Sequence, residues 1–377
     1  MSELHLSTPA AILLAVFALS VLLQLLYYLL FYLRVSLYRP GNRKENKEAV
    51  SVIICARNEA ENLEVFLPSV LEQEYDDFEV IVVDDCSDDD TEEVLDKYSK
   101  QYSRLKVTRI HKESSLRHGK KMALFLGIKA AKNELLLLTD ADCQPVSSQW
   151  ISSFASHFND STDFVLGYGG YLREKGLLNK YIRFDTMFIA MQYAGMAMAG
   201  RPYMGVGRNL AYRKSLFMKN KGFGPNINLQ SGDDDLFVNK LAGKKNTVVN
   251  LDPVSFTRSI PSKTWKEFHK QKTRHLSASS HYRMFSKFIL ATEPLSRLLF
   301  YSLLIVLFFI TGLHLILAIS AATVIICKLL TLGLAQKNLN EKDLLVISLL
   351  FDLISPFINV YFLLNVAFKR QQYYEWK

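Results

Sequence analysis

The sequence has few cysteines and lacks the short motifs that mark several large enzyme classes. Its four cysteines (Cys55, Cys86, Cys143 and Cys327) form no CxxC pair, so we expect no zinc site and no disulfide, only packing roles. No GxGxxG and no GxxxxGK[ST] occurs, which argues against an NAD-type fold and a P-loop. No internal repeat or long polar linker interrupts the 377 residues. With 49% hydrophobic and 22% charged residues, the chain is neither disordered nor collagenous.

The net charge of +8 predicts anionic partners, which are nucleic acid, anionic lipid or a phosphorylated substrate. The basic residues gather beside long apolar segments, and no nucleic-acid motif accompanies them. We therefore expect membrane lipids and phosphates as partners, and no nucleic acid.

The first long apolar segment is Pro9–Leu33, which has 25 residues without a charge. At about 1.5 Å per residue it is long enough to cross a hydrocarbon core of about 30 Å. A cleaved signal peptide would have a shorter apolar region preceded by basic residues. Here the basic residues follow it, at Arg34, Arg39, Arg43, Lys44 and Lys47. This pattern predicts an uncleaved anchor with the chain from residue 34 onward in the cytoplasm.

The C-terminal part contains two further apolar stretches. Leu298–Ala335 has a single charge, Lys328, and predicts two helices that turn near Ser320–Thr323. Leu344–Phe368 is interrupted by polar residues and has lysines on both sides. If both flanks are cytoplasmic, this stretch is either a re-entrant hairpin or a segment lying in the membrane interface.

Between the membrane segments the pattern is that of an α/β domain. Three short runs rich in β-branched residues or leucine predict parallel strands buried on both faces: Val50–Cys55, Phe78–Val83 and Leu135–Leu138. Helical patterns lie between or after them, over Ala60–Gln73, Asp90–Gln101 and Lys120–Lys132. Alternating strands and helices predict a doubly wound, mostly parallel sheet.

Ligands of such sheets bind beyond the carboxyl ends of the strands, and here those ends are acidic. The first strand is followed by Ala56-Arg57-Asn58-Glu59, the second by Asp84 and Asp85, and the third by Asp140 and Asp142. Alternate residues of an extended chain point the same way, so Asp140 and Asp142 are placed to face one cation. Oxygen ligands favour Mg²⁺ or Mn²⁺.

A second acidic cluster is Asp233-Asp234-Asp235. It is either a solvated helix N-terminus, where the helix dipole favours anions, or the source of a general base that deprotonates an acceptor hydroxyl.

Two helical segments and one loop complete the candidates. Ser262–Arg283 is basic, and it places Gln271, Arg274 and His275 on one face, where Arg274 could pair with a phosphate. Such a helix either lies on an anionic bilayer or is simply solvated. Asn179–Gly200 carries four methionines, typical of a core helix, with a lipid-acceptor groove as the alternative. The polar loop between His111 and His118 could order over a bound nucleotide.

Together these motifs resemble the family-2 glycosyltransferases with a GT-A fold, in particular the membrane-bound branch that includes poly-N-acetylglucosamine, cellulose and hyaluronan synthases. The resemblance covers residues 49–285. It rests on seven ordered motifs: Ser51–Glu59, Val83–Asp88, Gly119–Leu124, Thr139–Asp142, Gly207–Leu210, Gly232–Leu236 and Gln271–Arg274.

The resemblance implies roles for individual residues on the donor side. Ala56, Arg57 and Glu59, with Asp84 and Asp85, would hold the nucleoside, usually uridine. Lys120 would lie near the nucleotide. Asp140 would contact the ribose or diphosphate, and Asp142 would bind the metal, Mn²⁺ or Mg²⁺.

The same resemblance implies roles on the acceptor side. Asp233 would be the catalytic base, with Gly232 in place of the family's Glu, and Asp234 is a competing assignment. Gln271 and Arg274 match the QxxRW motif that closes over the diphosphate and acceptor. His275 replaces the Trp of that motif, which favours a single transfer over processive synthesis.

The expected protein is therefore a multi-pass inner-membrane enzyme with a cytoplasmic catalytic domain. Its predicted activity is inverting transfer of a sugar from a nucleotide-sugar to a lipid-linked or nascent saccharide. A processive synthase and a non-catalytic nucleotide- or lipid-binding protein are the alternatives. The expected divisions are an anchor with a basic juxtamembrane segment (1–48), a GT-A domain (49–261), a basic interfacial helix region (262–297), C-terminal membrane segments (298–368) and a tail (369–377).

Overall fold

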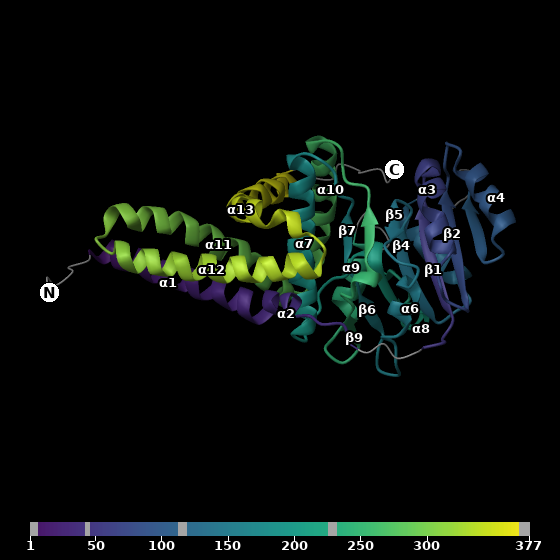
Figure 1. Ribbon diagram of the computed structural model, residues 1–377, viewed down its shortest axis with the longest axis horizontal. Helices are drawn as coiled ribbons and strands as arrows, with labels where there is room; N and C mark the ends of the chain where they lie inside the picture. Colours follow the sequence, from purple (N-terminus) through teal and green to yellow (C-terminus); the bar gives the residue numbers. More distant parts are fainter. Residues whose placement is uncertain (1–6, 42–45, 112–118, 225–231, 369–377) are drawn as a thin grey trace.

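The computed structural model describes residues 7–41, 46–111, 119–224 and 232–368, and it contains an α/β domain joined to a bundle of long helices (Figure 1). The domain is built on a seven-stranded sheet of order β3-β2-β1-β4-β8-β6-β9. Strands β1, β2, β3 and β4 are parallel, whereas β8 runs antiparallel to both β4 and β6. The strands are β1 (Val50–Ala56), β2 (Phe78–Asp85), β3 (Leu105–Ile110), β4 (Leu135–Asp140), β6 (Phe164–Leu166), β8 (Leu210–Arg213) and β9 (Thr247–Val249).

The three predicted strands and the three predicted helices between them are confirmed. The helices are α3 (Ala60–Leu71), α4 (Thr91–Gln101) and α5 (Lys120–Ala130). Every residue of β1 and β2 is buried, because one set of alternate side chains packs on the α3 and α4 side and the other on the α5 side. The sequence analysis did not predict β3, nor did it predict β6, β8 and β9. The last three have only three or four residues, and so short a strand leaves almost no periodic signal.

A second, three-stranded sheet has the order β5-β10-β7. Its strands are β5 (Cys143–Pro145), β7 (Gly169–Tyr171) and β10 (Thr257–Ser259). Ser259 is aligned with Cys143 on one side and with Tyr171 on the other. The domain also contains α6 (Trp150–Ala155), α7 (Leu177–Met198), η2 (Gly207–Asn209), α8 (Lys214–Lys219), α9 (Asp233–Leu241) and η4 (Pro253–Ser255). Helix α10 (Trp265–Ala278) and η5 (Ser279–His281) follow the domain.

Helices α1, α11 and α12 lie side by side and project away from the α/β domain (Figure 1). Their bounds are Thr8–Tyr27, Met284–Ile310 and His314–Asn338, and α1 continues through η1 (Tyr28–Tyr32) and α2 (Leu33–Ser36). With α13 (Leu345–Phe368, preceded by η6, Lys342–Leu344), the described residues contain four helices long and apolar enough to span a membrane.

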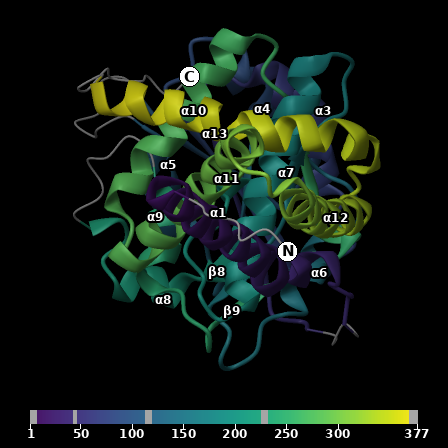
Figure 2. The same ribbon diagram turned by 90° about the vertical axis from the view of Figure 1, so that its left-hand side faces the viewer.

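Two expectations about the C-terminal segments need correction. The turn between the two helices lies at residues 311–313, and Ser320–Thr323 is in the middle of α12. The shift arises because α11 begins at Met284, so it includes Glu293 and Arg297, whose charges had excluded residues before 298 from the apolar stretch. Helix α13 is continuous through Pro356 and is not a hairpin; it runs crosswise to the other long helices (Figure 2).

Charged side chains within the bundle are paired with one another. Arg297 Nη1 donates to Asp352 Oδ1 over 2.9 Å, and Lys328 Nζ donates to Asp352 Oδ2 over 2.6 Å. Arg297 Nη2 also lies 3.2 Å from Glu293 Oε2. Because all four side chains are at most 1% exposed, the bundle interior holds two positive and two negative charges out of contact with lipid.

Candidate active site

Three strand ends meet at one edge of the large sheet, as the sequence predicts. In the strand register Cys55 of β1 is opposite Asp140 of β4, and Ala56 is opposite Asp84 of β2. The residues that follow β1, β2 and β4 therefore share one edge. This edge is where an open α/β sheet binds its ligands.

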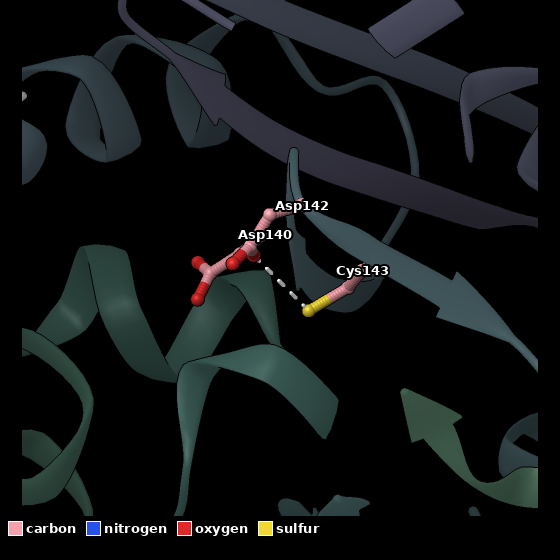
Figure 3. Close-up of side chains that lie close together, drawn as sticks. All are labelled: Asp140, Asp142 and Cys143. Atoms are coloured by element: carbon pink, nitrogen blue, oxygen red, sulfur yellow. Dashed lines mark hydrogen bonds between the residues drawn. The ribbon is translucent and has the colours of Figure 1, made fainter. Parts of the chain in front are cut away.

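At the end of β4, Asp140, Asp142 and Cys143 lie close together (Figure 3). One ligand atom from each lies within 4.8 Å of the others. Ser259 Oγ on β10 donates to Asp142 Oδ2 over 2.7 Å, and Cys143 Sγ donates to Asp142 Oδ1 over 3.5 Å. The Asp142 carboxylate is thus oriented by both β5 and β10 of the small sheet.

The start of α5 brings a positive charge to the same place. Lys120 Nζ lies 2.6 Å from Asp140 Oδ1, with both side chains 28% exposed. Gly119, which has a φ of 144°, donates its backbone N–H to Asp85 Oδ2 over 2.8 Å. Gly119, the residue before α5, is therefore attached to the end of β2, and Lys120 is held opposite Asp140.

The loops after β1 and β2 are bonded to each other. The backbone N–H of Asn58 donates to Ser87 Oγ over 2.9 Å, and the backbone N–H of Asp88 donates to Asn58 Oδ1 over 2.7 Å. Ser87 Oγ in turn donates to Asp84 Oδ1 over 2.5 Å. Among the described residues, the buried Nε of Arg57 has no hydrogen-bond partner. A donor left over beside two acidic loops is suited to an external acceptor such as a phosphate or a carbonyl.

The electrostatic environment shifts the pKa values of Asp140 and Asp142 in opposite directions. Burial alone would raise the pKa of Asp140, but the positive charge of Lys120, followed by those of Arg208 and Arg274, holds that pKa below its usual value. Burial and then the neighbouring charge of Asp140 raise the pKa of Asp142. Two carboxylates in this relation are stabilised by a cation between them.

The two carboxylates of this group fit a hard divalent cation. Burial and then the charge of Asp142 raise the pKa of the Cys143 thiol well above its usual value, so the sulfur is protonated and serves as a hydrogen-bond donor. Two carboxylates remain as ligands, the set that Mg²⁺ and Mn²⁺ accept when water and phosphate oxygens complete the shell.

Arginine and aromatic side chains line the other side of the acidic pair. The guanidinium carbon of Arg208 lies 4.4 Å from the centre of the Tyr171 ring. Burial lowers the pKa of Arg208, but Tyr171, Cys143, Asp140 and Asp142 outweigh it and raise that pKa overall. Sequence reasoning gave Arg208, Tyr171 and Ser259 no role. Only the position of Arg208 inside the Gly207–Leu210 motif was a signal for it.

Helix α10 carries Gln271, Arg274 and His275 to the same region. His275 keeps solvent-accessible surface, yet burial on its protein side, then Arg274, Arg208, Lys272 and Lys120, lower its pKa well below the usual value. The imidazole is available as a hydrogen-bonding group at this site.

The prediction that α10 is a basic surface helix needs correction at Lys272. This side chain is buried, and its Nζ lies 2.7 and 2.6 Å from the two oxygens of Asp185 on α7. Helix α10 also packs against α13, where Phe268 meets Phe362 with ring centres 6.1 Å apart. It is thus held between the α/β domain and the long helices.

The second acidic cluster opens α9, as its sequence suggests. Asp234 is 6% exposed and lies against Gly207, where a Cβ would approach Asp234 Oδ2 to 1.8 Å. Asp235 accepts a hydrogen bond from Tyr282 Oη over 3.0 Å. Asp233 is the first residue of the helix, and its side chain is outside the described part of the structure.

Two further candidate segments from the sequence are the methionine-rich helix and the loop between His111 and His118. Met187, Met191 and Met196 of α7 are buried in the main hydrophobic core, which supports the core-helix interpretation. The loop between His111 and His118 falls on residues 112–118, which are outside the described residues.

Comparison with known proteins shows which enzymes the α/β domain resembles. Residues 51–220 match the family model for glycosyl transferase family 2. The chain is 26% identical to a probable glycosyltransferase YdaM of Bacillus subtilis over 257 residues, which are 66% of this chain and 59% of that protein. It is 34% identical to a poly-beta-1,6-N-acetyl-D-glucosamine synthase of Staphylococcus epidermidis over 95 residues, 25% of this chain and 22% of that one.

A solved structure shares the fold over most of the chain. It is the mannosyltransferase PcManGT of Pyrobaculum calidifontis, in complex with GDP-Man and Mn²⁺, with a TM-score of 0.58 and 19% identity. The match covers 92% of this chain and 99% of that one. The expected GT-A fold and the resemblance to family-2 enzymes are confirmed.

Proposed function

Because residues 51–220 match the family model for glycosyl transferase family 2, we propose that the chain transfers a sugar from a nucleotide-sugar, a UDP-sugar, to a lipid-linked or nascent saccharide. The transfer proceeds with inversion at the cytoplasmic face of the inner membrane. One observation carries the proposal: Asp140 and Asp142 lie together at the carboxyl edge of the sheet, beside the acidic ends of β1 and β2.

The donor nucleotide binds at the ends of β1 and β2. Ala56, Arg57 and Glu59 form one side of this site and Asp84 and Asp85 the other. The bonds between the two loops support this placement, because they hold the binding surface in place before the donor arrives. The related fold of the Pyrobaculum mannosyltransferase, solved with GDP-Man and Mn²⁺, also supports a nucleotide-sugar donor and a divalent cation.

Asp142, with Asp140, holds the divalent cation, which supplies charge that stabilises the departing nucleoside diphosphate. Lys120, Arg208 and Arg274 add fixed positive charge around the same region, as their effects on Asp140 indicate. Gln271 and His275 line the path of the acceptor from α10.

Asp233 is the general base that removes the proton of the acceptor hydroxyl as it attacks the anomeric carbon. The competing residue, Asp234, is buried against Gly207, which supports a role in holding the loop that carries Arg208. The N-terminus of α9 also stabilises either carboxylate.

A membrane-bound acceptor is supported by the position of α10, which packs on α13 through the Phe268–Phe362 contact while carrying Arg274 into the site. The basic residues after the first long helix support a cytoplasmic position for the domain. The chain covers 59% of the Bacillus relative and 22% of the staphylococcal synthase, so the substrates of those proteins do not identify the substrate of this chain.

The test is nucleoside-diphosphate release by the purified, detergent-solubilised chain. UDP-, GDP- and dTDP-sugars are screened with Mn²⁺ or Mg²⁺ and native-membrane lipid extract as acceptor. Metal-dependent release from one donor, lost in Asp142→Asn, is the expected result. Folded protein that releases nothing from any donor contradicts the proposal and favours a non-catalytic binder. Product length separates a single transfer from processive synthesis.

A further inference from the structure

The turn between α12 and α13 inserts a carboxylate into the α/β domain. Glu341 is fully buried, and three side chains of the domain surround it. Tyr168 Oη donates to Glu341 Oε1 over 3.0 Å, and Arg183 Nε donates to Oε2 over 2.8 Å. The third donor is Arg258 Nη1, which forms an ion pair with Oε1. The long helices are thus joined to the domain by a buried ion pair.

Arg258 also forms a hydrogen bond with the backbone of the same turn. Its Nη2 donates to the carbonyl oxygen of Leu339 over 3.0 Å. Gly170 leaves room for this guanidinium in its observed position, since a Cβ there would lie 2.1 Å from Arg258 Nη1. The space around Arg258 is therefore shaped to fit the α12–α13 turn.

Arg258 is the middle residue of β10, and the next residue along that strand is Ser259. Neighbouring residues of a strand point to opposite faces, so Arg258 points toward Glu341 and Ser259 toward the acidic pair. Ser259 Oγ donates to Asp142 Oδ2 over 2.7 Å. A single short strand thus connects the turn between two long helices to the candidate metal ligand.

We propose that Glu341 is a positioning residue for the metal site. It holds β10 through Arg258, and β10 holds Asp142 in its metal-binding orientation through Ser259. The inference deepens the proposed function and rests on it. A shift of α12 or α13 moves Glu341 and so changes metal affinity, and by reciprocity metal binding stabilises the α12–α13 turn.

The experiment measures Mn²⁺ binding to the full chain in detergent from the loss of the free-Mn²⁺ electron paramagnetic resonance signal, with and without UDP. Ser259→Ala removes the direct contact and weakens Mn²⁺ binding about tenfold. Glu341→Gln keeps the side-chain volume, removes the charge and weakens binding about three- to tenfold. Both substitutions act through the same strand. The double variant should therefore bind Mn²⁺ with the same affinity as whichever single variant binds it more weakly.

Asp343→Asn is the matched control. Asp343 also pairs with Arg183, at 2.6 Å, and with Arg173, at 3.4 Å, but its side chain is 18% exposed, and its link to β10 runs only indirectly, from Arg183 through Glu341 to Arg258. Its neutral variant should bind Mn²⁺ like the wild type. If it weakens binding as much as Glu341→Gln does, general loosening of the joint explains both, and the inference is wrong.

Other results also decide between the inference and its alternatives. If Glu341→Gln binds Mn²⁺ with unchanged affinity, the inference is wrong while the proposed function stands. The same holds if the loss of affinity in the double variant equals the product of the losses in the two single variants. Absence of Mn²⁺ binding in the wild type overturns the metal-dependent function and the inference with it. If Glu341→Gln fails to fold, Gly170→Ala displaces the Arg258 guanidinium with Glu341 intact, and it must then show the same loss of affinity.

Discussion

The buried pair between α10 and α7 allows a prediction with a defined magnitude. Lys272 and Asp185 have side chains 8% and 10% exposed, and both oxygens of Asp185 lie within 2.7 Å of Lys272 Nζ. Lys272→Met keeps a long apolar stem but leaves Asp185 buried without its cation. Removing one partner of a buried pair costs about 3–5 kcal/mol, because the remaining charge is uncompensated.

The cost should appear as opening of α10, because this helix is held to the domain by that pair and by the Phe268–Tyr181 contact, with ring centres 5.8 Å apart. A cost of about 3–5 kcal/mol raises the equilibrium constant for opening of α10 roughly a hundred- to a few thousandfold, at about 1.4 kcal/mol per factor of ten. Amides that exchange only when the helix opens should exchange faster by the same factor. Hydrogen exchange of the amides of residues 265–278 measures it. Glycosyl transfer should fall as well, because Arg274 leaves the site.

The matched test is the double variant Lys272→Met with Asp185→Leu, which replaces the ion pair by apolar side chains. Such replacements are often neutral or stabilising. We expect protection of α10 to return close to that of the wild type. If the double variant exchanges as fast as Lys272→Met, the loss does not come from the unpaired carboxylate, and the reasoning is refuted.

Three further results are expected. Asp142→Asn should abolish Mn²⁺ binding yet raise the melting temperature of the metal-free protein, since it removes repulsion from the neighbouring carboxylate; scanning fluorimetry that shows a lower melting temperature contradicts this. Asp233→Asn should lower turnover by about 10²-fold or more while UDP binding by calorimetry is unchanged, and a variant with full turnover excludes it as the base. Gly195→Ala should lower the melting temperature and Gly312→Ala should not, because a Cβ at Gly195 meets the backbone oxygen of Phe31 at 2.4 Å and one at Gly312 has no atom within 4 Å.

The part of the site that sequence predicts well is the part determined by strand ends. Asp84 and Asp140 follow continuous apolar runs, and parallel strands place their carboxyl ends at one edge whatever their separation in sequence. Position after a strand was therefore enough to bring these residues together.

The part that sequence missed depends on contacts between distant segments. Ser259 lies in a three-residue strand with no periodic signal, and it reaches Asp142 only because β10 pairs with β5. Lys272 reads as one more exposed lysine of a basic helix until Asp185 of α7 is placed opposite it. Neither relation has a local signature, because the partners are 117 and 87 residues apart.

The same limit explains why the last apolar stretch was ambiguous. A hydropathy argument counts Asp352 as a break, because an isolated carboxylate in an apolar helix is costly. In the fold Asp352 is fully buried and bonded to Arg297 of α11, Lys328 of α12 and Tyr301 of α11. The carboxylate therefore fixes α13 against α11 and α12 and leaves the helix unbroken.

The outward face of α13 then agrees with its crosswise position. Val346 is 94% exposed, and Phe357 and Tyr361 are more than half exposed, whereas Asp352 is fully buried. A helix that turns its acidic side chain inward and its apolar side chains outward suits a membrane boundary, where polar protein lies on one side and lipid on the other. Of the two arrangements that the sequence leaves open for residues 344–368, the interfacial one agrees with this distribution, and the hairpin does not.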